Sequence, residues 1–136
     1  STVAYSCPQL SGNWKCLDEL NKPRYIEITQ NELRYNIKEK NSLSSALEVF
    51  ADGKEREENT FIFRTKTLAK CNQNNTLNIY QERKVLSEGL KSESHTNMDF
   101  SLIDDNSYTC KTVSDTQFDG QEPQHGEQTY HCVKLK

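Results

Sequence analysis

The sequence predicts an all-β protein, an antiparallel up-and-down β-barrel of about eight to nine strands. Short segments in which apolar and polar residues alternate recur along the chain, which is the period of a strand with one buried face. No helical pattern separates these segments, so parallel strands with crossover helices are not expected. A meander of antiparallel strands leaves two open edges, and closure into a barrel removes them. A two-sheet β-sandwich is the alternative architecture.

The first expected strand covers residues 10–16 and organises the rest of the chain. Leu10, Gly12, Trp14 and Cys16 share one side of it, and polar residues occupy the other side. Trp14 is the only tryptophan, so this strand carries the largest single apolar side chain. A glycine on the same face leaves room for another part of the chain to approach closely.

The second and third expected strands, residues 24–30 and 33–38, form a hairpin around a two-residue turn at 31–32. Apolar residues occupy alternate positions in both strands, as Ile26 and Ile28 do in the first of them. The alternation is cleanest in residues 33–38.

A fourth strand is expected at residues 46–51, followed by the Asp-Gly turn at 52–53. An Asp-Gly pair between two β-like runs is a strong hairpin signal, and the charged residues 54–58 are expected at the exposed base of that hairpin. Phe61 and Phe63 begin the fifth strand, which is expected to reach Cys71.

The C-terminal half is expected to contain four more strands. These are residues 76–86, 98–102, 108–112 and 130–135, with a turn at 72–75, an irregular polar segment at 87–97 and a long loop at 114–128. The loop and its neighbours are acidic, because residues 99–127 contain seven acidic residues and one basic residue, a net charge of −6.

Length and composition predict one domain, with residues 1–9 as an N-terminal arm and residues 10–136 as the barrel. Only 33% of the residues are hydrophobic and the mean hydropathy is −0.90, so we expect a small interior. The net charge of −3 gives no general attraction to nucleic acid or anionic membranes. No apolar run approaches the ~18 residues of a membrane span, so no membrane insertion is expected.

Five cysteines at irregular spacings favour disulfides and a secreted or periplasmic location, as a mature chain after removal of a signal peptide. In a closed meander the last strand neighbours the strand before it, which favours a Cys110–Cys132 disulfide. Cys7–Cys71 is the second expected pair, and Cys16 is then the free thiol. Other pairings remain open, since five cysteines with one unpaired allow fifteen arrangements.

Gly12-x-Trp14 on the first strand of such a chain resembles the calycins: lipocalins, fatty-acid-binding proteins and avidins. The resemblance implies that Trp14 seals one end of a lipocalin-like barrel and that Lys134 or Lys136 packs across its ring. The fatty-acid-binding proteins place two helices after the first strand, for which residues 17–24 are too few. The opening from Cys7 to Cys16 also loosely resembles small exported bacterial proteins that begin Cys-Pro-x-Leu-x-Gly-x-aromatic-x-Cys.

These expectations favour an exported, non-enzymatic binding protein for a small, partly polar ligand. The candidate residues of the barrel interior are Trp14, Tyr35, Phe61, Phe63 and Phe100. One alternative is a protein–protein interaction module with a solid core that binds a partner through loop 114–127. A lesser alternative is an enzyme with its site at the barrel mouth.

No cofactor or metal site is expected. The three histidines, His95, His125 and His131, could be combined with Cys132 or Asp119 as metal ligands, but their spacing is not that of a known metal site. The acidic residues Asp115, Asp119 and Glu122 lack the spacing of a calcium-binding loop.

Overall fold

The protein is all-β in the computed structural model, which describes residues 7–72, 74–85, 87, 89 and 91–136. The strands are β1 (Gly12–Leu17), β2 (Pro23–Asn31), β3 (Arg34–Glu39), β4 (Leu47–Phe50), β5 (Arg56–Asn59), β6 (Phe63–Asn72), β7 (Thr76–Val85), β8 (Ser92–Asp104), β9 (Ser107–Phe118) and β10 (Gln124–Lys134). Within the described residues there is no helix with the length and apolar character that crossing a membrane requires.

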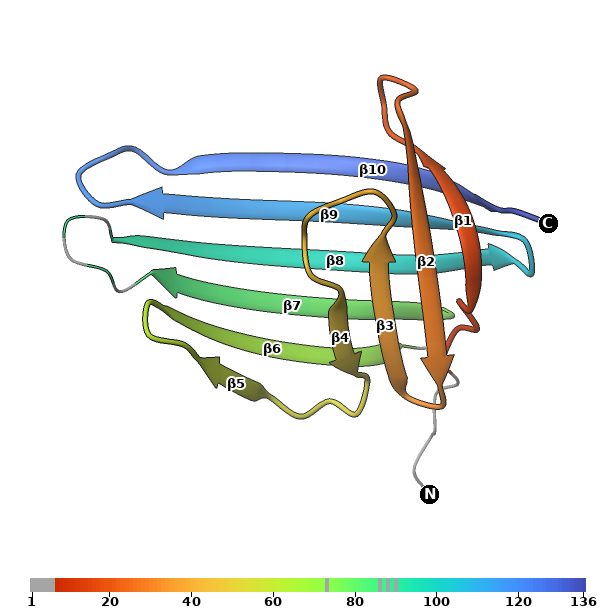
Figure 1. Cartoon of the computed structure of the whole chain (residues 1–136), viewed down its shortest axis with the longest axis horizontal. Coiled ribbons are helices and arrows are strands. Elements are labelled where there is room, and N and C mark those ends of the chain that lie inside the picture. The colour runs from red at the N-terminus through yellow and green to blue at the C-terminus, as the bar shows by residue number, and fades with distance from the viewer. Residues whose placement is uncertain (1–6, 73, 86, 88, 90) are drawn as a thin grey trace.

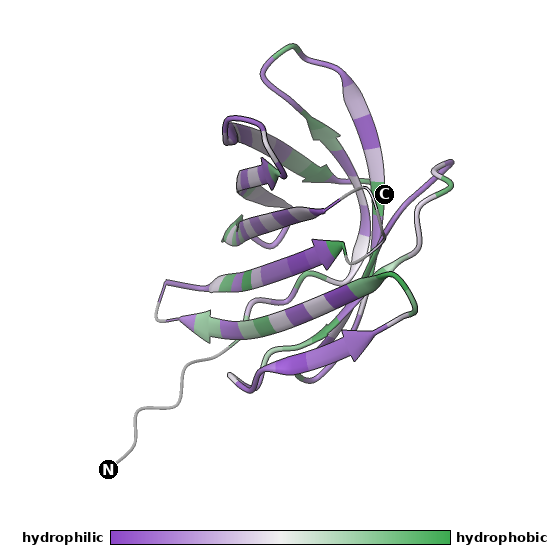
Figure 2. Cartoon of the chain, turned by 90° about the vertical axis from the view of Figure 1, so that its left-hand side faces the viewer, coloured by the Kyte–Doolittle hydropathy of each residue, from purple (hydrophilic) through white to green (hydrophobic). Residues whose placement is uncertain are grey.

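All strands belong to one antiparallel sheet in the order β4-β3-β2-β1-β10-β9-β8-β7-β6-β5. Strands that follow one another in the chain pair with one another, except β4 and β5, and β1 also pairs with β10. The short strands β2–β4 cross over one end of the long strands β6–β10, whose other end extends beyond them (Figure 1). Seen from the side, the sheet curls strongly and forms a half-barrel rather than two separate sheets (Figure 2).

The expected hairpin at the Asp-Gly turn was wrong. Strands β4 and β5, on either side of this turn, are the two opposite edges of the sheet. Asp52 forms an isolated antiparallel bridge with Lys70 of β6, and the Gly53 N–H donates to the Ala69 carbonyl at 2.9 Å. At this turn the chain therefore passes from one edge strand of the sheet to the other. The charged segment that was expected at the base of a hairpin contributes residues to the additional strand β5.

Strands β8, β9 and β10 are longer than their apolar residues predict. Residues 92–97 belong to β8, and most of the expected loop 114–128 belongs to the β9–β10 hairpin, which leaves only residues 119–123 as the connection. These extensions consist mainly of polar residues, so they show no apolar alternation. Backbone pairing between neighbouring long strands holds them instead: Ser114 of β9, for example, lies opposite Thr96 of β8 on one side and opposite Gly126 of β10 on the other. Leu86, the expected end of the sixth strand, lies outside the described residues.

The core lies where β1–β4 cover the long strands. Trp14 is fully buried, and its indole N–H donates to the Leu10 carbonyl at 2.9 Å. Its ring meets Tyr108 of β9 edge-on, with 4.6 Å between ring centroids. Tyr35 is also fully buried, donates to the Pro8 carbonyl at 2.7 Å, and has a pKa raised to about 12 by burial.

Gly12 allows Lys134 to cover Trp14. A Cβ atom on Gly12 would lie 2.6 Å from Lys134 Cε, and Gly12 has φ of +145°, a conformation that side chains rarely adopt. Lys134 is opposite Trp14 in the β1–β10 register, and its ammonium lies 5.4 Å from the indole centroid. The close approach expected at Gly12 and the lysine expected over Trp14 are therefore the same contact.

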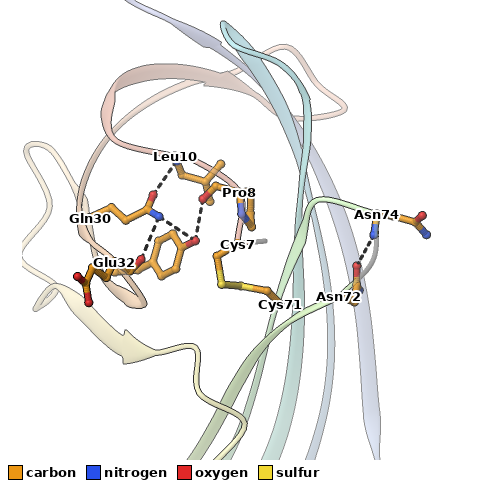
Figure 3. Close-up of a disulfide and its surroundings, with 9 residues drawn as sticks. Cys7, Pro8, Leu10, Gln30, Glu32, Cys71, Asn72 and Asn74 are labelled. Carbon is orange, nitrogen blue, oxygen red and sulfur yellow. Dashed lines mark hydrogen bonds between the residues drawn. A yellow bond between two sulfur atoms is a disulfide. The ribbon is translucent and has the colours of Figure 1, made fainter. Parts of the chain in front are cut away.

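The structure contains two disulfides, Cys7–Cys71 and Cys16–Cys132, and Cys110 is a free buried thiol. The first is the expected bond and ties the N-terminal arm to β6, beside the hydrogen bonds of Pro8, Leu10 and Gln30 (Figure 3). The expected Cys110–Cys132 bond and the expected free Cys16 were wrong. Cys132 lies directly opposite Cys16 in the β1–β10 register, whereas Cys110 lies opposite Tyr130.

Candidate functional site

The candidate site is a partly open cavity of about 140 Å³ between β1–β3 and the ends of β8–β10 that they cover. It is lined mainly by apolar side chains that point into the curl of the sheet. The lining residues are Cys16, Arg24, Ile26, Ile37, Met98, Phe100, Tyr108, Cys110, Thr112, Tyr130 and Cys132. Two larger hollows, of about 310 and 440 Å³, lie at the polar surface of the long strands and are lined mostly by charged and hydroxyl-bearing residues.

Alternation along β8 and β9 builds the apolar wall. Met98 and Phe100 of β8 lie opposite Thr112 and Cys110 of β9, so all four share one face of the sheet. Phe100 also contacts Tyr108, with 5.9 Å between ring centroids. Because Tyr108 also lines the cavity and contacts Trp14, this wall is continuous with the core.

A polar group lies at the edge of the cavity. The Arg24 guanidinium donates to both carboxylate oxygens of Glu39, from Nε at 2.8 Å and from Nη2, and to the Tyr130 hydroxyl at 2.7 Å. It also lies over the Tyr130 ring, 5.1 Å from its centroid. The hydrogen bonds between Arg24 and Glu39 lower the pKa of the Glu39 carboxyl and raise the pKa of the Arg24 guanidinium. Both side chains are therefore charged, and their charges cancel.

The free thiol of Cys110 faces this cavity and is 8% exposed. Burial raises its pKa to about 11, so the thiol is protonated at neutral pH and is a poor nucleophile. Its Sγ lies 3.8 Å from the Thr112 hydroxyl. The neighbouring Cys16–Cys132 disulfide lines the same cavity, and Cys16 Sγ lies 3.6 Å from the Tyr108 hydroxyl.

Of the five residues expected in the barrel interior, Phe100 lines the cavity. Trp14 and Tyr35 are completely buried in the solid part of the core. Phe61 is fully exposed, which corrects its expected interior position, because it precedes β6 in the connection from β5. Phe63, at the uncovered end of β6, has the Arg83 guanidinium 5.2 Å above its ring.

Sequence analysis missed Arg24, Glu39 and Tyr130, which give the cavity its polar edge. Arg24 and Glu39 come together because β2 and β3 pair. Tyr130 joins them across β1, because Cys16 lies opposite both Arg24 and Cys132, and Cys132 is two residues from Tyr130. The apolar residues at alternate positions in these strands, Met98 and Phe100 in one and Tyr108 and Cys110 in the other, could have predicted the apolar wall. No sequence pattern linked that wall to Arg24.

The other candidate clusters of the sequence do not assemble. Among the described residues, neither the three histidines nor the acidic set Asp115, Asp119 and Glu122 forms a group whose ligand atoms converge. A different group, Glu82, Glu93 and His95, does converge on the outer face of the sheet.

No protein-family model matches the chain, and no curated protein or solved structure matches it significantly either. The fold and the cavity therefore define a class by their architecture alone: an all-β half-barrel with a small, partly open cavity, compatible with a lipocalin-like fold. Its two disulfides suggest an oxidising, extracellular environment.

Proposed function

We propose that this protein is an exported, non-enzymatic binder of a small, mainly apolar molecule with one polar group. The observation that supports this function is the cavity between β1–β3 and β8–β10, whose apolar wall ends at the hydrogen-bonding group of Arg24, Glu39 and Tyr130. Apolar walls with a few placed polar groups are typical of small-molecule sites.

The size of the cavity restricts the ligand. About 140 Å³ is close to the roughly 150 Å³ cavity that holds benzene in an engineered protein core. Drug-sized ligands occupy pockets of roughly 300–1,000 Å³. A fatty acid or another long apolar chain is therefore too large to be enclosed in this partly open cavity, whereas a single ring or a short branched molecule fits.

The polar edge restricts the charge of the ligand. Because the charges of Arg24 and Glu39 cancel, the pair gives an anionic ligand no net electrostatic attraction unless the ligand displaces Glu39 from the guanidinium. Within the described residues, three of the five guanidinium N–H groups donate to Glu39 and Tyr130, which leaves two for a neutral acceptor. An uncharged hydroxyl or carbonyl group is the best match.

The half-barrel is, in this proposal, of the lipocalin type. Trp14 on β1 with Lys134 from the last strand across its ring supports this assignment, because it reproduces the arrangement that the Gly12-x-Trp14 resemblance implies. The tryptophan then forms a closed floor, and the ligand binds on the other side of Tyr108.

Phenol and benzene are suitable probes, with binding followed by nuclear magnetic resonance on the full chain. We expect dissociation constants in the millimolar range, about −4 kcal/mol, and shifts confined to residues around Met98 and Phe100. Phenol should bind about fivefold more tightly than benzene, because one net hydrogen bond contributes about 1 kcal/mol.

A cavity-filling variant provides the control. Cys110→Leu places a larger apolar side chain in the cavity and should abolish binding, whereas Val113→Leu, on the opposite face of the same strand, should leave it unchanged. Phenol should also protect the Cys110 thiol from methyl methanethiosulfonate. If the wild-type chain takes up neither probe, or if Cys110→Leu binds as well as wild type, the ligand-binding proposal is wrong and a solid core is favoured.

A protein partner is the second candidate function. Residues 114–127, expected as its loop, instead form the exposed end of the β9–β10 hairpin and carry Asp115, Asp119, Glu122 and Glu127. This acidic end favours a basic partner. Capture of a lysine-rich peptide by the wild-type chain, with loss of capture after neutralising these four carboxylates, is the test.

A further inference from the structure

The outer face of β7 and β8 carries three converging metal-ligating side chains, on the side of the sheet opposite the cavity. The ligand atoms of Glu82, Glu93 and His95 all lie within 4.8 Å of one another. We propose that these three side chains bind a divalent transition-metal ion of the Zn²⁺ type. No step of the proposed ligand binding depends on this site.

Strand pairing positions the three ligands. Glu82 of β7 lies directly opposite His95 of β8, and Glu93 precedes His95 by two residues on the same face of β8. Directly opposite residues have Cβ atoms about 4.5–5.5 Å apart, which is close enough for their ends to share one ion. Both strands are paired on both sides, so the backbone that carries these residues is fixed.

The His95 ring is oriented by its neighbours. His95 Nε2 lies 2.9 Å from a Glu93 carboxylate oxygen, and His95 Nδ1 lies 2.6 Å from the Tyr80 hydroxyl. A metal-binding histidine normally has its other ring nitrogen held by a hydrogen-bond acceptor. When Nε2 binds an ion in place of its proton, the Tyr80 hydroxyl is placed to accept from Nδ1–H in this role, and Nε2 already points toward Glu93.

The donor set favours zinc over the hard cations. Zn²⁺ combines imidazole nitrogen with carboxylate oxygen, and sites with three protein ligands keep a fourth position for water. The side chains of His95 and Glu93 are 39% and 43% exposed, so water has access to that position. Mg²⁺ and Ca²⁺ prefer oxygen ligands throughout and should bind more weakly.

Lys84 competes with the metal. Its ammonium lies 3.5 Å from a Glu82 carboxylate oxygen, and Lys84 is opposite Glu93 in the register of β7 and β8. An incoming cation must displace this ammonium, so removal of the Lys84 charge should tighten metal binding. Zinc bound at another place on the protein would not be tightened by removal of the Lys84 charge, so this change in affinity is specific to the site at Glu82.

The same sheet face offers a matched control at His125. Its Nδ1 lies 2.6 Å from Asp115 and its Nε2 lies 3.3 Å from Glu127, so opposite sides of the ring contact the two carboxylates. The three ligand atoms therefore do not converge on one point. The His125 cluster thus also combines one imidazole with two carboxylates, but its ligand atoms do not have the converging geometry of the His95 cluster.

Isothermal titration calorimetry with ZnCl₂ on the chelator-treated full chain tests the site. We expect one ion per chain, with affinity reduced at least about tenfold in His95→Gln and in Glu93→Gln. Affinity should be unchanged in His125→Gln and increased about threefold in Lys84→Met. Circular dichroism checks that each variant is folded, and Cys110→Leu should bind zinc as wild type does, which separates this site from the cavity.

Three results would overturn the proposal. One is the absence of bound zinc in equilibrium dialysis at about 100 µM, a concentration well above the dissociation constant expected of a three-ligand site. The second is loss of binding in His125→Gln with retention in His95→Gln. The third is equal binding of Ca²⁺ and Zn²⁺, which would indicate general attraction to exposed carboxylates.

Discussion

Replacement of Gly12 by alanine tests the contact on which the closed end of the half-barrel depends. The backbone at φ of +145° suits glycine, and forcing another residue into such a conformation costs about 1–3 kcal/mol. The new Cβ would also lie 2.6 Å from Lys134 Cε and would move the ammonium away from Trp14. Loss of that cation–π contact costs about 0.5–2 kcal/mol. We therefore expect Gly12→Ala to lower the free energy of unfolding by about 1.5–5 kcal/mol, the sum of these two costs.

A double-mutant cycle separates these two effects. In a Lys134→Ala background the backbone cost remains but the collision is absent, so Gly12→Ala should cost about 0.5–2 kcal/mol less than in wild type. Urea unfolding with both disulfides intact, followed by the fluorescence of the single tryptophan, measures each free energy. Gly126→Ala is the control, because its Cβ would meet no atom within 4 Å.

Equal costs of Gly12→Ala in the two backgrounds would refute the role assigned to Lys134. A Gly12→Ala protein as stable as wild type would refute the requirement for glycine at this backbone position as well. Lys134→Ala by itself should shift Trp14 emission to longer wavelength, because water would then reach a ring that is fully buried in wild type.

Three further predictions concern the core, the disulfide and the polar edge. Trp14→Ala should cost about 3–5 kcal/mol in urea unfolding, since a buried aromatic side chain leaves a cavity; a loss below about 1 kcal/mol would show that the ring is not in the core. Non-reducing peptide mapping should find Cys16 linked to Cys132, and a disulfide that contains Cys110 would contradict the register of β1 and β10. Removal of the bond by replacing both cysteines with alanine should lower the free energy of unfolding by about 2–5 kcal/mol. Arg24 lowers the pKa of Glu39 in the folded protein. The pair therefore contributes stability at pH values above the ordinary carboxyl pKa, and this contribution is lost as the pH falls through the lowered pKa. The stability difference between wild type and Glu39→Gln should shrink on acidification from about pH 7 to about pH 2, and growth of that difference would contradict the pairing.

Local patterns in the sequence were sufficient for most of the fold. The alternation around Trp14, Ile28 and Tyr35 predicted strands with one buried face, and the structure buries these residues completely or nearly so. The glycine at position 12 indicated a close approach by another part of the chain, and the resemblance to the calycins implied that a lysine of the last strand packs across Trp14. The sequence thus predicted the strand class, most strand positions and the buried face of the strands around these residues, and it favoured the Cys7–Cys71 bond among several possible pairings.

The polar ends of the long hairpins were not predictable in this way. Residues 92–97 and 114–128 present polar side chains to both faces, so no burial pattern distinguishes them from loops. They are strands because each backbone pairs with a neighbour already held in place by the core. The ligand atoms of Glu82, Glu93 and His95 converge only through that pairing.

The tertiary structure decided the contacts between residues far apart in the chain. It placed Cys16 rather than Cys110 opposite Cys132, because register depends on the whole β1–β10 pairing and not on which strands are neighbours. It separated β4 from β5 across the sheet, although an Asp-Gly turn lies between them. It also brought Arg24 to Tyr130 at the edge of the cavity. Side-chain alternation is a local property that sequence alone determines, whereas register and curl depend on the packing of all strands together.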